Sequence, residues 1–179
     1  MNNKQLLTEL KKLSACEEAV KWVDGFDLKT AWDECERADW MLWYMCMVEL
    51  ATKRERIHII CDCAATALKY VPKGENRPRE AIEAARRYAD EPTEENLRLL
   101  RAAAEVAVWV AWATEAAEVA VWVAWAAEVA EAAGGAAVWV AWATEAARAA
   151  AGATRVAEAA GGAAAHKHMC KMIREKIKL

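Results

Sequence analysis

The chain has 179 residues and a net charge of −3, and its mean hydropathy is only −0.06 because alanine supplies much of the 56% hydrophobic content while charged residues make up 28%. This composition is typical of a soluble, helix-rich protein and gives no support to nucleic-acid binding. The start, MNNKQLLTELKKL, lacks the apolar stretch of a secretory signal, and uncharged runs such as 132–144 are shorter than the roughly 20 residues that span a bilayer. We therefore expect a cytoplasmic protein whose partners include no nucleic acid and no membrane.

The first forty residues predict short helices separated by capping residues. An apolar stripe of leucines at helical spacing marks the first helix, namely Leu6, Leu7, Leu10 and Leu13. Ser14 followed by Glu17 predicts a capping box for the second helix, and Asp27 is expected to begin another helix after the break at 24–25. Asp39 is predicted to cap the run WMLWYMCMVEL, which is apolar almost all round and is therefore expected to be a central buried helix.

The next helix begins with a second capping box, formed by Thr52 and Glu55. It is expected to end at 71–72, where a proline and then a glycine follow. One apolar face is predicted for it, consisting of Ile57, Ile60, Cys61, Ala64, Ala67, Leu68 and Val71.

Two more helix starts follow in this ordinary part of the sequence. Asn76 and Pro78 open one helix, since proline suits the first helical turn. Small and aromatic residues are predicted on its inner side, namely Ala81, Ala84, Ala85 and Tyr88. Pro92 and Thr93 are expected to start the last long helix of this part. No window alternates with period two, so no sheet is predicted.

Three near-copies of one tryptophan-rich unit, at 107–119, 120–132 and 137–149, dominate the rest of the chain. They contain six of the ten tryptophans, namely Trp109, Trp112, Trp122, Trp125, Trp139 and Trp142. Two tryptophans three residues apart lie side by side on a helix, but the 13-residue step turns the next pair by about 220°. Such rotating faces suit packing on two sides, either inside the protein or between subunits of a homo-oligomer, and do not suit a one-sided membrane anchor.

The two Gly-Gly pairs, at 134–135 and 161–162, are the only double breaks in this part of the chain. They predict helices over 93–133, 136–160 and 163–178 joined by tight turns; alternatively, one continuous helix runs through them. The sequence therefore predicts an all-α fold, a multi-helix bundle with long Ala/Trp-rich antiparallel helices in the C-terminal half.

This pattern also predicts the domain organisation. Residues 1–100 are expected to form a helical core domain and 101–165 the Ala/Trp-rich repeat helices. The C-terminal helix at 166–179 is expected to pack back on the core, so that the whole chain forms one domain.

Nothing in the sequence indicates a catalytic, cofactor or metal site. The six cysteines, Cys16, Cys35, Cys46, Cys61, Cys63 and Cys170, are expected to be reduced and mostly buried thiols. His58 lies near Cys61 and Cys63, but a Cys-x-Cys pair on a helix points its sulfur atoms about 200° apart, which is poor for joint zinc coordination. His166, His168 and Cys170 form a second group near the end. We expect no metal, no cofactor and no enzymatic activity.

Polar and aromatic residues in two stretches are the candidates for binding a protein partner. They are Trp32, Asp33, Glu36, Asp39 and Trp40 in the first stretch, and Glu75, Arg77 and Arg79 in the loop KGENRPRE. An arginine at such a helix entrance can pair bidentately with a carboxylate. That carboxylate belongs either to a partner or to an internal network that fixes the turn.

Four pieces of the sequence carry a resemblance to a known family. They are LSACEEAVKWV at 13–23, TAWDECERADWMLW at 30–43, CDCAATALKYVPKGENRPREAIEAA at 61–85 and CKMIREKI at 170–177. On these pieces the chain resembles the immunity proteins associated with bacterial polymorphic toxin systems. The resemblance implies a small helical protein that binds and neutralises a cognate toxin. Family members carry an alanine-rich segment of variable length before the last helix, often with Tyr where this chain has Trp.

The function expected from these observations is that of a non-enzymatic helical binding protein, an immunity protein that neutralises a toxin by protein–protein binding. The acidic balance agrees with this expectation, because it would steer the chain onto a basic partner. The alternative is a structural or self-assembling helical protein whose tryptophan faces make homo-oligomer contacts.

Overall fold

The computed structural model describes residues 1–66, 68–70, 73–113 and 162–179, and at 70 and 104–113 it describes the backbone only. All regular structure in these ranges is helical, so the expected all-α class is confirmed. The described chain divides into two compact units: unit 1 is Met1–Leu50 with His166–Leu179, and unit 2 is Ala51–Ala165. The predicted grouping of 1–100, 101–165 and 166–179 into one domain stays a prediction.

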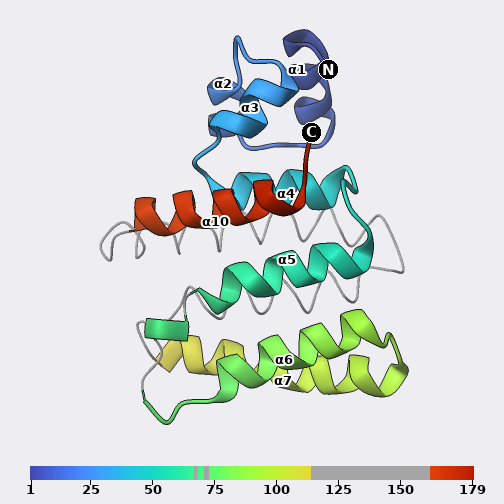
Figure 1. Ribbon diagram of the computed structural model, residues 1–179, viewed down its shortest axis with the longest axis vertical. Helices are drawn as coiled ribbons and strands as arrows, with labels where there is room; N and C mark the ends of the chain where they lie inside the picture. The colour runs from blue at the N-terminus through green and yellow to red at the C-terminus, as the bar shows by residue number, and fades with distance from the viewer. Residues whose placement is uncertain (67, 71–72, 114–161) are drawn as a thin grey trace. The chain divides into compact units, whose positions relative to one another are not determined.

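Unit 1 contains four short helices and most of the last one. These are α1 (Asn3–Lys12), α2 (Glu17–Trp22), α3 (Leu28–Glu34), α4 (Ala38–Met47) and α10 (Gly162–Lys176). Figure 1 shows α10, in red, running beside α4. Its buried residues Met169, Cys170, Ile173 and Ile177 belong to the same core as Leu6, Leu10, Met41, Leu42 and Met45. The final helix therefore completes a core that the first fifty residues begin.

Unit 2 contains α5 (Lys53–Ala65), a short 3-10 helix, η1 (Leu68–Tyr70), α6 (Arg77–Asp90) and α7 (Glu94–Ala113). Helix α6 packs against both α5 and α7, and Figure 1 shows the three helices side by side. Apolar faces read from the sequence form this core: Ile57, Ile60, Cys61 and Ala64 from α5 and Ala81, Ala84, Ala85 and Tyr88 from α6 are all buried.

Several predicted helix starts are confirmed because local chemistry decides them. Asp27 caps α3 by accepting a hydrogen bond from the Thr30 N–H at 2.7 Å. The capping box of Thr52 and Glu55 is present at α5, and Asn76 stands at the N-cap of α6. The starts of α7 and α10 also agree with the expected 93 and 163 to within one residue.

Two predicted caps are wrong. Ser14 does not begin α2 but lies at the C-terminal end of α1, where it has a left-handed φ of 61°. The Ser14 N–H donates to the Lys11 carbonyl and the Ala15 N–H to the Leu10 carbonyl, and these two hydrogen bonds terminate α1. Cys16 takes the N-cap of α2 without a side-chain bond. Asp39 does not cap α4, because the helix already begins at Ala38 and the Asp39 carboxylate lies in its first turn.

The predicted end of the helix that Thr52 caps is also wrong. Helix α5 ends at Ala65 rather than at 71–72, and the Thr66 hydroxyl donates to the Cys63 carbonyl at 2.7 Å, where it satisfies one of the last backbone acceptors. The 3-10 turn at Leu68–Tyr70 then follows. Ala67 and Val71 of the predicted apolar face lie outside the described residues.

Of the tryptophan units, only the beginning falls within the described backbone. Trp109 and Trp112 lie in α7, as the helical pattern predicts. The other four repeat tryptophans, the predicted antiparallel helices and the turn at 134–135 lie outside the residues that the structure describes. Within the described residues, no helix has both the length and the apolar character needed to cross a membrane.

Candidate functional site

The tight turn between α2 and α3 places two aromatic side chains on one side of unit 1. Gly25 has a φ of 91°, a left-handed conformation that glycine adopts without strain, and it lets the chain reverse after α2. The Asn3 amide donates to the carbonyls of Val23 and Phe26, both at 2.8 Å. These two hydrogen bonds fix the turn to α1 and so fix Trp22 and Phe26.

Three half-buried aromatic rings meet at this turn. The Trp22 ring contacts the Phe26 ring edge-on, with centroids 5.3 Å apart, and contacts the tilted ring of Trp40 at 5.8 Å. The guanidinium of Arg37 lies over the Trp40 ring, 4.5 Å from its centroid. We call Trp22, Phe26, Trp40 and Arg37 the aromatic face.

Asp39 holds Arg37 in this position. Both oxygens of the Asp39 carboxylate accept from the guanidinium, with distances of 2.9 Å to Nε and 2.6 Å to Nη2. These hydrogen bonds raise the pKa of Arg37 above its usual value. Only 12% of the Asp39 side chain and 32% of the Arg37 side chain are exposed, so the pair is fixed in a partly desolvated position.

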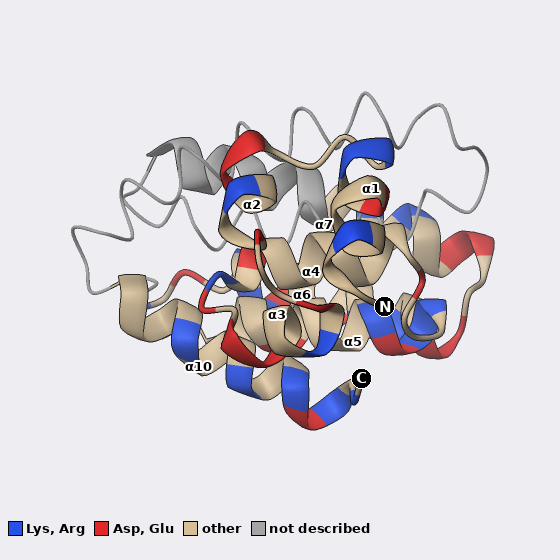
Figure 2. Ribbon diagram, turned by 90° about the horizontal axis from the view of Figure 1, so that it is seen from above, with Lys and Arg blue, Asp and Glu red and all other residues tan. Residues whose placement is uncertain are grey.

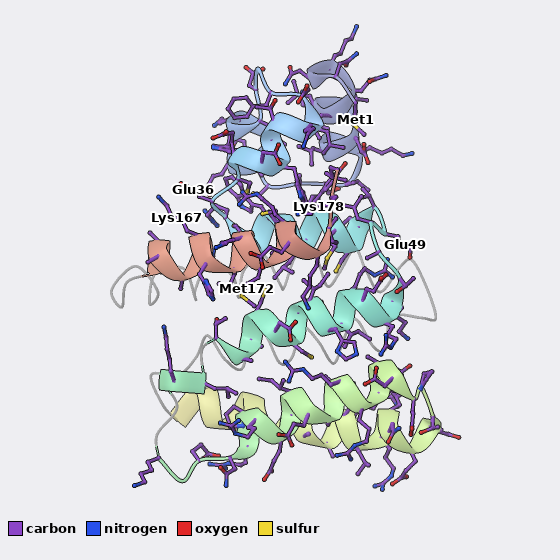
Figure 3. The ribbon with its side chains drawn as sticks, in the orientation of Figure 1. Met1, Glu36, Glu49, Lys167, Met172 and Lys178 are labelled. Carbon is purple, nitrogen blue, oxygen red and sulfur yellow. The ribbon has the colours of Figure 1, made fainter. Side chains whose placement is uncertain are left out.

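Helix α10 supports the aromatic face from inside unit 1. His166 Nδ1 accepts a hydrogen bond from the Ala38 N–H at 3.2 Å, and Arg174 donates to the carbonyl oxygens of Trp32, at 2.9 Å, and Cys35. Lys167 forms an ion pair with Glu36 at 2.9 Å, and Figure 3 shows these two labelled side chains close together. The connection between α3 and α4 is therefore held in place by the last helix.

The segment that contributes the aromatic face is acidic. Residues 13–40 contain eight acidic and three basic side chains, and Asp24, Asp33, Glu34 and Glu36 are exposed. Helix α10, by contrast, carries lysine and arginine along its length, as the blue bands in Figure 2 show. Because opposite charges attract, residues 13–40 favour contact with a basic surface over contact with an acidic one.

The first group of predicted partner residues divides between core and surface. Trp32 is only 4% exposed, so its ring belongs to the core, and its indole N–H has no hydrogen-bond partner among the described residues. Asp33 is exposed and pairs with Lys29 at 3.0 Å. Glu36 is exposed beside Lys167, whereas Asp39 and Trp40 take part in the aromatic face.

The second predicted group, Glu75, Arg77 and Arg79, belongs to unit 2. The Glu75 carboxylate accepts from the Arg77 guanidinium and, at 3.0 Å, from the Arg77 backbone N–H. These bonds lower the pKa of Glu75 to about 2. Of the two interpretations offered for this loop, the internal network that fixes the turn is present, while the Arg79 side chain is exposed.

Sequence reasoning missed Trp22, Phe26 and Arg37, and it considered His166 only as a possible metal ligand. The spacing of Trp22 and Phe26, four residues apart across a helix end, is a signal that could have paired them. Arg37 stands between the predicted Glu36 and Asp39 but was not singled out. No local signal connects His166 with Ala38, because 128 positions separate them.

Several titratable groups of the described chain are buried or take part in ion pairs. Burial raises the pKa of the Cys35 thiol to about 11 and that of the Cys61 and Cys170 thiols to about 12, so these groups are poor nucleophiles at neutral pH. His58 and Arg54 of α5 both bind Asp90 of α6, at 2.9 and 2.8 Å, and hold the pKa of that carboxyl below its usual value. The described residues include every histidine and cysteine, and no group of three or more potential ligands among them could hold a metal.

Comparisons with known proteins add no relative to this picture. No family model, no curated protein and no solved structure matches the chain.

Proposed function

We propose that the chain is a non-enzymatic immunity protein that binds and neutralises a cognate toxin by docking its aromatic face on that partner. The observation that carries the proposal is the fixed cluster of Trp22, Phe26 and Trp40, with Arg37 lying over the Trp40 ring. The resemblance to immunity proteins on residues 13–23 and 30–43 supports it, because these two pieces contain Trp22, Arg37 and Trp40 of the cluster.

The composition of the aromatic face is that of a binding hot spot. Tryptophan and arginine are enriched among the residues whose truncation weakens protein complexes most, because the Trp ring buries a large area and the Arg guanidinium makes several directed hydrogen bonds. Here the rings are half-buried and already held by contacts within unit 1. Binding would therefore order few side chains that are not already ordered.

The acidic side chains around the cluster give the expected partner its chemistry. A basic toxin would be steered toward residues 13–40 by long-range attraction, and the aromatic contacts would then form at short range. The expected association rate falls as salt is added, because exposed charges are screened within about 10 Å at 0.1 M salt.

Co-expression with the toxic product of a neighbouring gene tests the proposal. Wild-type chain is expected to restore growth, and Arg37→Ala and Trp40→Phe are expected to weaken rescue because each removes part of the aromatic face. With the purified pair, Trp40→Ala should raise Kd by roughly 30-fold or more, the loss typical of a hot-spot residue.

Arg98→Ala is the matched control, because Arg98 is also paired with a carboxylate but is exposed on α7 of unit 2. Its rescue should equal that of wild type. Thermal unfolding of every variant shows whether the fold survives. A folded Arg37→Ala, Trp40→Phe double variant that rescues growth fully would contradict docking through this face.

The alternative of self-assembly rests on the six tryptophans of the repeated units. Light scattering separates it from toxin binding. A mass that corresponds to an oligomer, and falls to that of the monomer when Trp109, Trp112, Trp122 and Trp125 are changed to Ala, would favour assembly. A monomer in both proteins would exclude it.

A further inference from the structure

His166 lies where its protonation state can affect the aromatic face. It lies on α10 with 13% of its side chain exposed, and its Nδ1 accepts from the Ala38 N–H at 3.2 Å. Ala38 is the first residue of α4, and the first N–H groups of a helix have no partner within the helix. His166 thus caps α4 from another helix, and it can do so only while Nδ1 carries no proton.

A carboxylate that already serves the aromatic face lies next to the same ring nitrogen. An Asp39 oxygen is 3.7 Å from His166 Nδ1, and that carboxylate holds Arg37 over Trp40. Asp39 therefore stands between two cationic groups, one permanently charged and one that can become charged. When His166 takes up a proton, it competes with Arg37 for the Asp39 carboxylate.

The other polar groups of this region are thiols or are engaged in ion pairs and hydrogen bonds of their own. Burial keeps the thiols of Cys35 and Cys170 protonated, with pKa values of about 11 and about 12. Glu36 is paired with Lys167, and Arg174 donates to backbone carbonyl oxygens. The competing groups that remain are Asp39, which favours a charged ring, and Arg37, which opposes it.

We propose that His166 is an acid-sensitive switch for the aromatic face, an inference that rests on the proposed function of that face. On taking a proton from solvent at Nδ1, His166 gives up the Ala38 N–H and draws the Asp39 carboxylate away from Arg37. Arg37 then leaves its place over Trp40, and the face loses its cationic contact. Binding is strongest with neutral His166 and weakens in acid.

The direction of the pH dependence follows from burial. Burial, opposed in part by Asp39 and aided by Arg37, lowers the pKa of His166 below its usual 6.5. The ring is therefore neutral at pH 7.5 in the folded chain. The cap on Ala38 is fully present above 6.5 and is lost as pH falls through the lowered folded value.

Nuclear magnetic resonance on the free chain tests the switch without any partner. Between about pH 7.5 and about pH 5, the Ala38 amide proton should move upfield and the Arg37 Nε–H signal should shift, both with the same midpoint. His168→Asn, a change at an exposed histidine two residues along α10, should leave both titrations intact. His166→Asn keeps an acceptor near the position of Nδ1 but cannot titrate, so both signals should stay in their neutral-pH positions.

Two results on the free chain would overturn the switch. One is a titration of Ala38 that persists in His166→Asn. The other is a wild-type chain in which Ala38 titrates and Arg37 Nε–H does not, because the aromatic face would then be uncoupled from His166. Neither result bears on whether the face binds a toxin, which the growth rescue tests separately.

Once a toxin that the chain neutralises is identified, the affinity of each variant for it at neutral and acid pH completes the test. Wild type and His168→Asn should bind about fivefold or more weakly in acid, the loss expected for one interface contact, and His166→Asn should keep its affinity. Any effect of pH on the toxin itself is common to the measurements on all three chains. Equal acid weakening in His166→Asn and wild type would refute the regulatory role while leaving the proposed function in place.

Discussion

At the scale of single residues, Arg174 shows how one side chain on α10 can complete a distant helix end. Its Nε donates to the Trp32 carbonyl at 2.9 Å and its Nη2 to the carbonyl of Cys35, the C-cap residue of α3. The last carbonyl groups of a helix lack partners within the helix, and a cation also favours the negative end of its dipole. Arg174 therefore satisfies two acceptors that would otherwise be left without protein partners.

Changing Arg174 to Ala should lower the free energy of unfolding of unit 1 by about 1–3 kcal/mol, because hydrogen bonds to a charged donor are lost and their acceptors stay partly buried. Urea unfolding followed by circular dichroism measures the loss. Arg174→Lys should recover only part of it, since one ammonium group cannot reproduce the planar fork of the guanidinium. Lys171→Ala, at an exposed position on the same helix, should change stability by less than about 0.5 kcal/mol.

At the scale of elements, the start of α5 shows a helix defined by its own first turn. The Thr52 side chain accepts from the Glu55 N–H at 3.3 Å, and the Glu55 carboxylate accepts in return from the Thr52 N–H at 2.9 Å. Two backbone donors that the helix cannot satisfy are thereby paired. The burial of Ile57 and Ile60 then depends on a helix that begins at this register.

Thr52→Ala should destabilise unit 2 by about 1 kcal/mol, the usual effect of removing a side-chain cap. Amide hydrogen exchange along α5 measures the change locally and should show faster exchange in the first turn. Thr8→Ala is the matched control, because the Thr8 hydroxyl bonds the Lys4 carbonyl in the middle of α1 and caps nothing. A Thr52→Ala chain as stable as Thr8→Ala would contradict the capping role.

At the scale of the whole molecule, the six cysteines report on both compact units. Cys16 is exposed, while Cys35, Cys46 and Cys170 are buried in unit 1 and Cys61 and Cys63 in unit 2. Because the reactive species is the thiolate, burial blocks access to all five buried thiols and also raises the pKa of Cys35, Cys61 and Cys170.

A disulfide reagent at mildly alkaline pH should therefore modify one thiol per native chain quickly and the other five much more slowly. Cys16→Ser should remove the fast phase. Mass spectrometry of chains labelled at increasing urea concentration should show whether the thiols of the two units become reactive together or in turn. Two fast thiols in the native chain would contradict the burial described above.

The parts of the fold that could be predicted are those that nearby residues decide. The caps at Asp27 and Thr52 involve groups three residues apart, so their chemistry is visible in the sequence. Apolar periodicity also predicted the buried side of α6. The cap expected at Ser14 failed because that residue suits either end of a helix, and here it closes α1.

The aromatic face was only partly predictable for a related reason. Trp40 and Asp39 were recognised, but the role of Asp39 changed from helix cap to holder of Arg37, because the α4 N-terminus is satisfied from α10. Trp32 was expected at the surface with its neighbours and lies in the core. Such outcomes depend on contacts between residues more than a hundred positions apart, which no local pattern encodes.

The contacts that join α10 to α3 and α4 connect residues 128 to 142 positions apart, and this separation has a consequence for how the gene can change. The free energy of closing so long a loop grows only with the logarithm of its length. One more 13-residue tryptophan unit would lengthen the loop by about a tenth and weaken closure by on the order of 0.1 kcal/mol. By this loop-closure term alone, duplication or deletion of one whole unit between these contacts is nearly neutral for the stability of unit 1.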